Sequence, residues 1–202
     1  MVYPEVLNKS IEYLKKLPGV GEKSAERMAL SLLDLSLDDV NELAESLKDA
    51  KNRLHKCSIC GALTENDICE ICTSANDGGR KKNTICVLED YKSVFAFEKA
   101  GNFDGVYHVL GGLISPIDGI GPEDINLSKL VNRVNELDNV ELIIALKSSV
   151  EGEATTLYIK KIFENKNVAI SRLSYGIPMG VEIEYLDELT LLNALNDRKK
   201  IS

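Results

Sequence analysis

Apolar side chains recur every three or four residues through the first 54 positions of the chain, the spacing that places them on one face of a helix. They form three groups: Val6, Leu7, Ile11, Leu14 and Leu17, then Met28, Leu32 and Leu33, then Leu43, Leu47 and Leu54. Between the first two groups, the segment from Leu17 to Gly21 holds a proline and two glycines, which must break the helix. The pattern predicts a helical domain over residues 1–54.

A different pattern begins near residue 83. Apolar runs of strand length alternate with stretches of helical periodicity, the runs at 84–88, 106–110, 140–146 and 168–173 and the helical stretches at about 91–100, 126–137 and 152–165. Alternation of this kind is typical of an α/β domain with a largely parallel sheet. We expect such a domain over residues 83–174.

The remaining segments follow neither pattern over their whole length. Residues 55–82 are polar and organised by cysteines, and they end in the basic, glycine-containing segment 76–82, which we interpret as a flexible linker. Residues 175–202 begin with a Gly-x-Pro-x-Gly turn and continue with an amphipathic segment around Leu189, Leu192 and Leu195, which predicts a helical tail for assembly. The chain is therefore expected to be a multidomain α/β protein.

Composition narrows the class of protein. A hydrophobic content of 44% in 202 residues supports a packed core. No apolar run approaches the ~18 residues that a membrane-spanning helix needs. The first 30 residues are charged and amphipathic, unlike a secretory signal. We therefore expect a cytoplasmic protein that does not associate with a membrane.

The net charge of −8 argues at first against a nucleic-acid partner, because affinity for DNA comes largely from lysine and arginine. The charges are unevenly distributed, however. Residues 1–30 hold five basic and four acidic side chains, residues 51–82 hold six and four, and residues 83–202 hold 12 and 18. DNA contacts are therefore expected in the N-terminal segments, and the acidic remainder is suited to metal ions or basic protein partners.

Four of the five cysteines form two Cys-x-x-Cys units, Cys57 with Cys60 and Cys69 with Cys72, separated by eight residues. Units this close can bring four thiolates around one tetrahedral ion, and metal binding would then stabilise a module too small to fold by burial. Four thiolates leave no open coordination position, so we expect one structural zinc per chain. Two redox-active thiol pairs are the alternative.

Two further residues could enter the metal chemistry but are given other roles. His55 could replace a ligand, but four cysteines complete the set, so a surface or supporting role is expected. Cys86 lies within the apolar run 84–88, and free cysteines are usually buried, so we interpret it as a core residue.

The segment from Leu17 to Arg27 places Gly19 and Gly21 between two predicted helices. Such a turn exposes backbone N–H groups beside a helix N-terminus, which suits a phosphate oxygen. Lys23 and Arg27 are four residues apart and share a helix face, with Ser24 beside them. The segment resembles the helix-hairpin-helix motif, which holds DNA by its backbone; an ordinary helical hairpin is the alternative.

Three acidic residues follow predicted strands: Glu89 after 84–88, and Glu151 and Glu153 after 140–146. Because functional groups of parallel sheets lie beyond the carboxyl ends of strands, we expect one carboxylate cluster, tolerable only if solvated or paired with cations. The arrangement resembles the Toprim domain, whose acids bind magnesium for phosphoryl chemistry. The pair here is Glu-Gly-Glu, where catalytic Toprim enzymes usually carry Asp-x-Asp, and no tyrosine is convincingly placed as a nucleophile.

The order of these modules resembles the RecR family of bacterial recombination mediators over essentially the whole chain. The segments 110–121, 150–155, 175–182 and 189–195 also look like that family, whereas residues 146–149 are less polar than the family pattern. The resemblance implies no catalytic activity, ring-like tetramers that encircle double-stranded, single-stranded or gapped DNA, and cooperation with RecO and RecF. It further implies a role in repair of DNA damage, where RecA replaces single-strand-binding protein at gaps, and a location at the nucleoid.

Two other interpretations of the acidic residues stay open. A magnesium-dependent Toprim nuclease or primase would use Glu89, Glu151 and Glu153 to hold the metal ion, and would show a DNA-dependent activity that is lost when one acid is changed. Alternatively, the three acids are solvated residues at strand ends, which is compatible with a DNA clamp.

Overall fold

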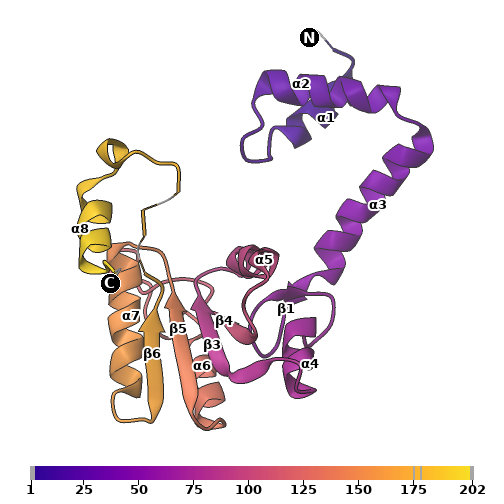
Figure 1. The fold of residues 1–202 in the computed structure, drawn as a ribbon. Helices are drawn as coiled ribbons and strands as arrows, with labels where there is room; N and C mark the ends of the chain where they lie inside the picture. Colours follow the sequence, from indigo (N-terminus) through magenta and orange to yellow (C-terminus); the bar gives the residue numbers. More distant parts are fainter. Residues whose placement is uncertain (1–2, 175, 178, 201–202) are drawn as a thin grey trace. The chain divides into compact units, whose positions relative to one another are not determined.

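The computed structural model describes residues 3–174, 176–177 and 179–200, and the chain divides into two compact units, residues 1–54 and 55–202 (Figure 1). Tyr175 and Pro178 of the predicted C-terminal turn lie outside the described residues. None of the described helices is long and apolar enough to cross a lipid bilayer.

The first unit is helical, as the periodicity predicts. Its elements are α1 (Glu5–Leu14), α2 (Glu22–Ser31), the 3-10 helix η1 (Leu32–Asp34) and α3 (Leu37–Arg53). Helix α1 packs against α2 around a small core of Ile11, Ala25 and Ala29. Helix α3 begins where Ser36 Oγ accepts a hydrogen bond from the Asp39 backbone N–H, and it has no buried residue.

The second unit combines a cysteine-containing module with a sheet and helices. Its elements are β1 (His55–Lys56), β2 (Leu63–Thr64), α4 (Glu70–Asn76), β3 (Lys81–Leu88), α5 (Tyr91–Ala100), β4 (Gly105–Val109), α6 (Leu127–Asn135), β5 (Val140–Ala145), α7 (Val150–Phe163), β6 (Val168–Arg172), η2 (Ile183–Tyr185) and α8 (Glu188–Asn196). Strands β1 and β2 form a small antiparallel pair.

The larger sheet has the order β4-β3-β5-β6, and all its neighbouring strands are parallel (Figure 1). Side chains alternate between its faces, so Ile85 and Val87 of β3 enter one core cluster while Cys86 and Leu88 enter another. Helices connect the strands, as parallel pairing requires. The predicted multidomain α/β class is confirmed.

Two segment boundaries differ from the prediction. The expected linker 76–82 is shorter, because α4 continues to Asn76 and β3 already begins at Lys81, whose N–H donates to the Asp104 carbonyl at 2.8 Å. Helix α7 begins at Val150 rather than near residue 152, because Ser149 Oγ accepts from the Gly152 N–H at 3.2 Å and caps it. Glu151 and Glu153 therefore lie in the first turn of a helix.

The cysteine module is packed onto the sheet rather than tethered loosely to it. The Val109 N–H of β4 donates to the Cys60 carbonyl at 2.7 Å, and Val109 belongs to the same buried cluster as the four cysteines of the module. Arg80 forms a two-pronged ion pair with Glu98, with nitrogen–oxygen distances of 3.0 and 2.6 Å. Tyr107 Oη donates to the same carboxylate at 2.6 Å. These contacts fix the segment that joins the module to the sheet.

Candidate metal centre and nucleic-acid interface

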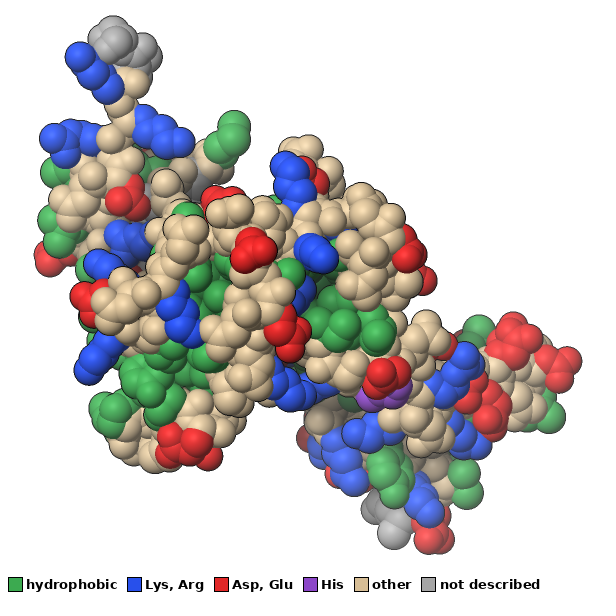
Figure 2. Space-filling view, turned by 90° about the horizontal axis from the view of Figure 1, so that it is seen from below, with side chains coloured by type: hydrophobic (Ala, Val, Ile, Leu, Met, Phe, Trp, Pro, Cys, Tyr) green, Lys and Arg blue, Asp and Glu red, His purple; other side chains and the backbone are tan. Residues whose placement is uncertain are grey.

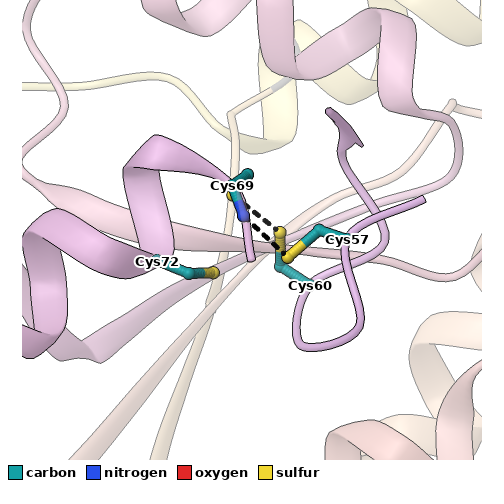
Figure 3. A group of neighbouring side chains, drawn as sticks. All are labelled: Cys57, Cys60, Cys69 and Cys72. Carbon is teal, nitrogen blue, oxygen red and sulfur yellow. Dashed lines mark hydrogen bonds between the residues drawn. The ribbon is translucent and has the colours of Figure 1, made fainter. Parts of the chain in front are cut away.

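The four paired cysteines converge on one point (Figure 3). Cys57 and Cys60 lie on the turn between β1 and β2, Cys69 is the N-cap residue of α4, and Cys72 lies in the first turn of that helix. All four are buried, and their sulfur atoms lie within 4.8 Å of one another. Gly61 closes the turn with a positive φ of 76°, and a Cβ there would approach the Val109 carbonyl to 3.1 Å.

Backbone donors and the neighbouring thiols shape the electrostatics of this centre. The N–H groups of Cys69 and Ala62 donate to the sulfur atoms of Cys57 and Cys60, at 3.3 and 3.5 Å. Hydrogen bonds with the neighbouring thiols, that of Cys60 first, lower the pKa of Cys57. The pKa of Cys72 is raised, and its hydrogen bond with the Cys57 thiol contributes most to that shift. Four thiolates this close repel one another unless a cation joins them, and the donor set is the one that zinc prefers.

The other candidates for metal chemistry lie outside this group. Cys86 is buried in the sheet, as predicted, and burial raises the pKa of its thiol to about 12. His55 is exposed on β1.

The glycine hairpin joins α1 and α2 as the sequence predicts. Gly19 adopts a left-handed φ of 80°, which favours glycine, and Gly21 is the N-cap of α2. No side chain caps this end, so the first N–H groups of α2 have no side-chain acceptor. Lys23 and Arg27 are exposed, and Ser24 is half-buried. Together they place a helix N-terminus and two cations on one small surface, which can hold a phosphate group.

The three predicted acids lie after two neighbouring strands, Glu89 after β3 and Glu151 and Glu153 after β5. Glu89 follows β3 and lies 3.4 Å from Lys147 Nζ, and Glu153 on α7 lies 3.2 Å from Arg172 Nη1. Hydrogen bonding to Ser149 lowers the pKa of Glu151. Among the described residues, the cysteines form the only group of three or more whose potential metal-ligand atoms lie within 4.8 Å of one another. That the three acids act together as one carboxylate cluster stays a prediction.

Lys147 and Arg172, which contact two of these acids, were not selected by sequence reasoning. Both lie at the carboxyl ends of strands, Lys147 after β5 and Arg172 as the last residue of β6. Their positions could have been used to predict them, because functional side chains of parallel sheets lie beyond the carboxyl ends of the strands, and this applies to cations as well as to acids.

Two residues hold the acidic turn in place. A Cβ at Gly152 would collide with the Lys147 carbonyl oxygen, so the residue between Glu151 and Glu153 has no room for a side chain. The buried Thr155 Oγ1 accepts from the Ile114 N–H at 2.9 Å and donates to the Glu151 carbonyl at 2.7 Å. Thr155 thereby connects the loop 110–121 to α7.

Comparison with known proteins follows the same division of the chain. Family models match residues 7–51 as RecR, helix-hairpin-helix, residues 54–74 as RecR, four-cysteine zinc finger domain, residues 83–174 as Toprim domain, and residues 176–199 as RecR, C-terminal. Proteins named Recombination protein RecR from Staphylococcus haemolyticus (strain JCSC1435) and from Staphylococcus aureus (strains Mu3 and Mu50) are 45% identical to this chain over 201 residues, covering 100% of both chains. The chain belongs to the RecR family.

Membership of the RecR family confirms the resemblance stated from the motifs and supports a role in recombination and repair. The four converging cysteines lie inside the segment matched by the four-cysteine zinc finger model, which supports zinc as their metal. The hairpin with Lys23 and Arg27 lies inside the helix-hairpin-helix match. The acids lie inside the Toprim match.

Proposed function

We propose that this RecR-family chain is a DNA-binding recombination mediator that acts without catalysis. It would form a ring-shaped clamp on double-stranded, single-stranded or gapped DNA. With RecO and RecF, it would help RecA replace single-strand-binding protein at gaps. The proposal places it in the cytoplasm, at the nucleoid.

The observation that carries this proposal is the hairpin surface of the first unit, made by Gly19, Gly21, Lys23 and Arg27. Its uncapped helix N-terminus and two exposed cations suit phosphate oxygens, and contacts to phosphate position DNA without reading its sequence. Binding through such a surface is independent of sequence and falls as salt rises. A protein that acts wherever a gap occurs requires that kind of binding.

Assembly into a ring is supported by apolar surface that the chain does not bury by itself. Helix α3 has no buried residue, and Leu37 and Leu47 on it are 76% and 64% exposed. Val6 on α1 is 81% exposed and Leu33 on η1 is 69% exposed. Exposed apolar surface of this extent is typical of a protein–protein interface. We propose that further copies of the chain cover it, in a tetramer.

The acids of the Toprim domain are proposed to dock a basic partner, RecO, rather than to hold magnesium for cleavage. Glu89 and Glu153 are engaged by Lys147 and Arg172, and these pairs would have to open before both acids could bind a metal ion. Exposed ion pairs are weak, so a partner's arginines and lysines can displace them. One structural zinc per chain completes the proposed cofactors; magnesium held by Glu89, Glu151 and Glu153 is the alternative to docking.

The test is DNA binding by the purified protein on single-stranded, double-stranded and gapped oligonucleotides, with and without magnesium and RecO, followed for complex formation and strand cleavage. The proposal expects complexes whose affinity falls with salt, a supercomplex with RecO, and no cleavage in any condition. Magnesium-dependent cleavage that disappears in Glu151→Ala would replace the proposal with a Toprim nuclease.

A further inference from the structure

A groove runs between the cysteine module and α6 within the second unit. It has a volume of about 490 Å³. The amide and cationic groups of its lining come from α4, β3 and α6: Asn76, Lys82, Lys129, Asn132 and Arg133. A recess of about 130 Å³ continues it, because Ser58 and Lys129 line both cavities.

Basic residues outnumber acidic ones along this groove, although the whole chain carries a net charge of −8. Lys82, Lys129 and Arg133 line the larger part, and Lys56 joins Lys129 in the recess. Among the described lining residues, Glu136 is the only carboxylate. Figure 2, which looks at the molecule from below, shows Lys and Arg as well as Asp and Glu side chains interspersed with hydrophobic ones, so the charge of the groove follows from its lining residues. The groove is thus a local exception to the acidic character of the second unit.

The geometry of the cations is set by the surrounding backbone. Lys129 and Arg133 are four residues apart on α6 and therefore face the same side. Arg133 Nη1 donates to the Tyr107 carbonyl at 2.7 Å, which holds the guanidinium at the wall of the groove. Ser58 Oγ is already directed to the Asp67 carboxylate at 3.2 Å, so the lysines, the other N–H groups of Arg133 and the amides of Asn76 and Asn132 are the donors left for a ligand.

The lining favours one class of ligand. Of the described residues that line the groove, none is phenylalanine, tyrosine or tryptophan, so the lining offers more to phosphate groups than to bases. A series of lysine, arginine and amide donors suits the repeated anions of a phosphodiester backbone. A cavity of this volume matches a small-molecule site and is too small to enclose a duplex.

We propose that this groove binds the phosphate backbone of single-stranded DNA, as a contact separate from the glycine hairpin. The inference rests on the proposed function, because it assumes that the chain binds DNA at all. It adds a binding site on the second unit and a preference for one strand over a duplex at that site.

The same cations could instead offset the charge of the metal centre, because four thiolates around a zinc ion carry a net charge of −2. Cys72 lines the groove, so the centre is close enough for this role. In that case substituting the lysines would weaken zinc retention and leave DNA binding unchanged. The two roles are therefore separable by measuring zinc and DNA binding on the same variants.

The experiment compares three full-length proteins: the parent, the variant Lys82→Glu, Lys129→Glu, and the control Lys99→Glu, Lys161→Glu. The control makes the same change in charge at exposed lysines outside the groove. Binding to a fluorescent single-stranded oligonucleotide and to its duplex is measured at several salt concentrations, together with zinc content and thermal unfolding. A poly-glutamate peptide tests for an acidic protein ligand.

We expect the groove variant to bind the single strand about tenfold more weakly than the control at low salt, with a slope of log affinity against log salt reduced by about 1.4, since each phosphate contact contributes ~0.7. Duplex binding and zinc content should match the control. Single-strand binding equal to the control overturns the inference, as does a loss confined to the peptide or to zinc. If the parent protein binds no DNA, both this inference and the proposed function are overturned.

Discussion

At Gly152 even a methyl group would meet the carbonyl oxygen of Lys147. We therefore expect Gly152→Ala to lower the free energy of unfolding by about 2 kcal/mol, the usual cost of forcing an extra carbon into packed structure. Gly176→Ala is the matched control, because nothing lies within 4 Å of a Cβ at that position. Urea unfolding of both variants measures the difference. Equal stability of the two variants would show that the turn accommodates the extra methyl group without a cost in stability.

The charge of Glu151 gives a second expectation at the residue scale. Sequence reasoning expects clustered acids to repel, so that removing one would leave stability unchanged or slightly raise it. Hydrogen bonding to Ser149 lowers the pKa of Glu151, which lies in the first turn of α7. The carboxylate is thus stabilised where it lies, and Glu151→Ala should leave thermal stability unchanged or slightly lower it.

Glu151→Ala should still weaken binding to RecO in a salt-sensitive way, if the acids dock a basic partner. Glu164→Ala, at the other end of α7, removes the same charge away from the acidic turn and serves as the control. Titration of each variant with RecO at two salt concentrations measures the effect, and DNA binding by the isolated chain should stay intact. RecO affinity equal in the two variants would contradict the docking role.

The residue positions on the edge of the sheet were predictable, but their pairing was not. The rule that strand ends carry function selects Glu89, Glu151 and Glu153 from the sequence alone. The partners lie far away along the chain, Lys147 being 58 residues from Glu89. Side-chain pairing over that separation depends on strand order and helix position, which periodicity does not specify.

At the scale of elements, the cysteine module depends on its metal. We expect one zinc per chain, and we expect Cys60→Ser to lose zinc and unfold the module, because the metal supplies its folding free energy. Cys86→Ala is the control, since that cysteine lies in the sheet outside the sulfur group. Metal analysis of protein that has never carried a purification tag provides the measurement. Folded parent protein with almost no zinc would contradict the assignment.

Periodicity predicted the strands of the large sheet and the helices between them well, because each of these elements has buried residues or packs against a core. The alternation of β3, with Ile85 and Cys86 on opposite sides, is an example. It failed where local hydrogen bonds decide the outcome. Ser149 begins α7 earlier than the apolar pattern suggests, and pairing with β4 draws Lys81 into a strand from a segment that is typical of a linker.

At the scale of the whole molecule, the order of four modules was readable from motifs because each has its own local signature. The cysteine spacing, the glycine hairpin, the Glu-Gly-Glu turn and the Gly-x-Pro-x-Gly turn are each confined to a few residues. Assembly has no such signature. The exposed leucines of α3 have helical spacing, which by itself does not distinguish a face buried within the chain from one covered by another copy.

The central claim is that the chain holds DNA by its backbone through the glycine hairpin, and the double variant Lys23→Glu, Arg27→Glu tests it most directly. Both side chains are exposed, so the fold should survive. Affinity should fall for all DNA sequences alike, and the slope of log affinity against log salt should decrease by about 1.8 on duplex DNA, at ~0.9 per phosphate contact. A variant that binds as tightly as the parent at the same salt would contradict the account.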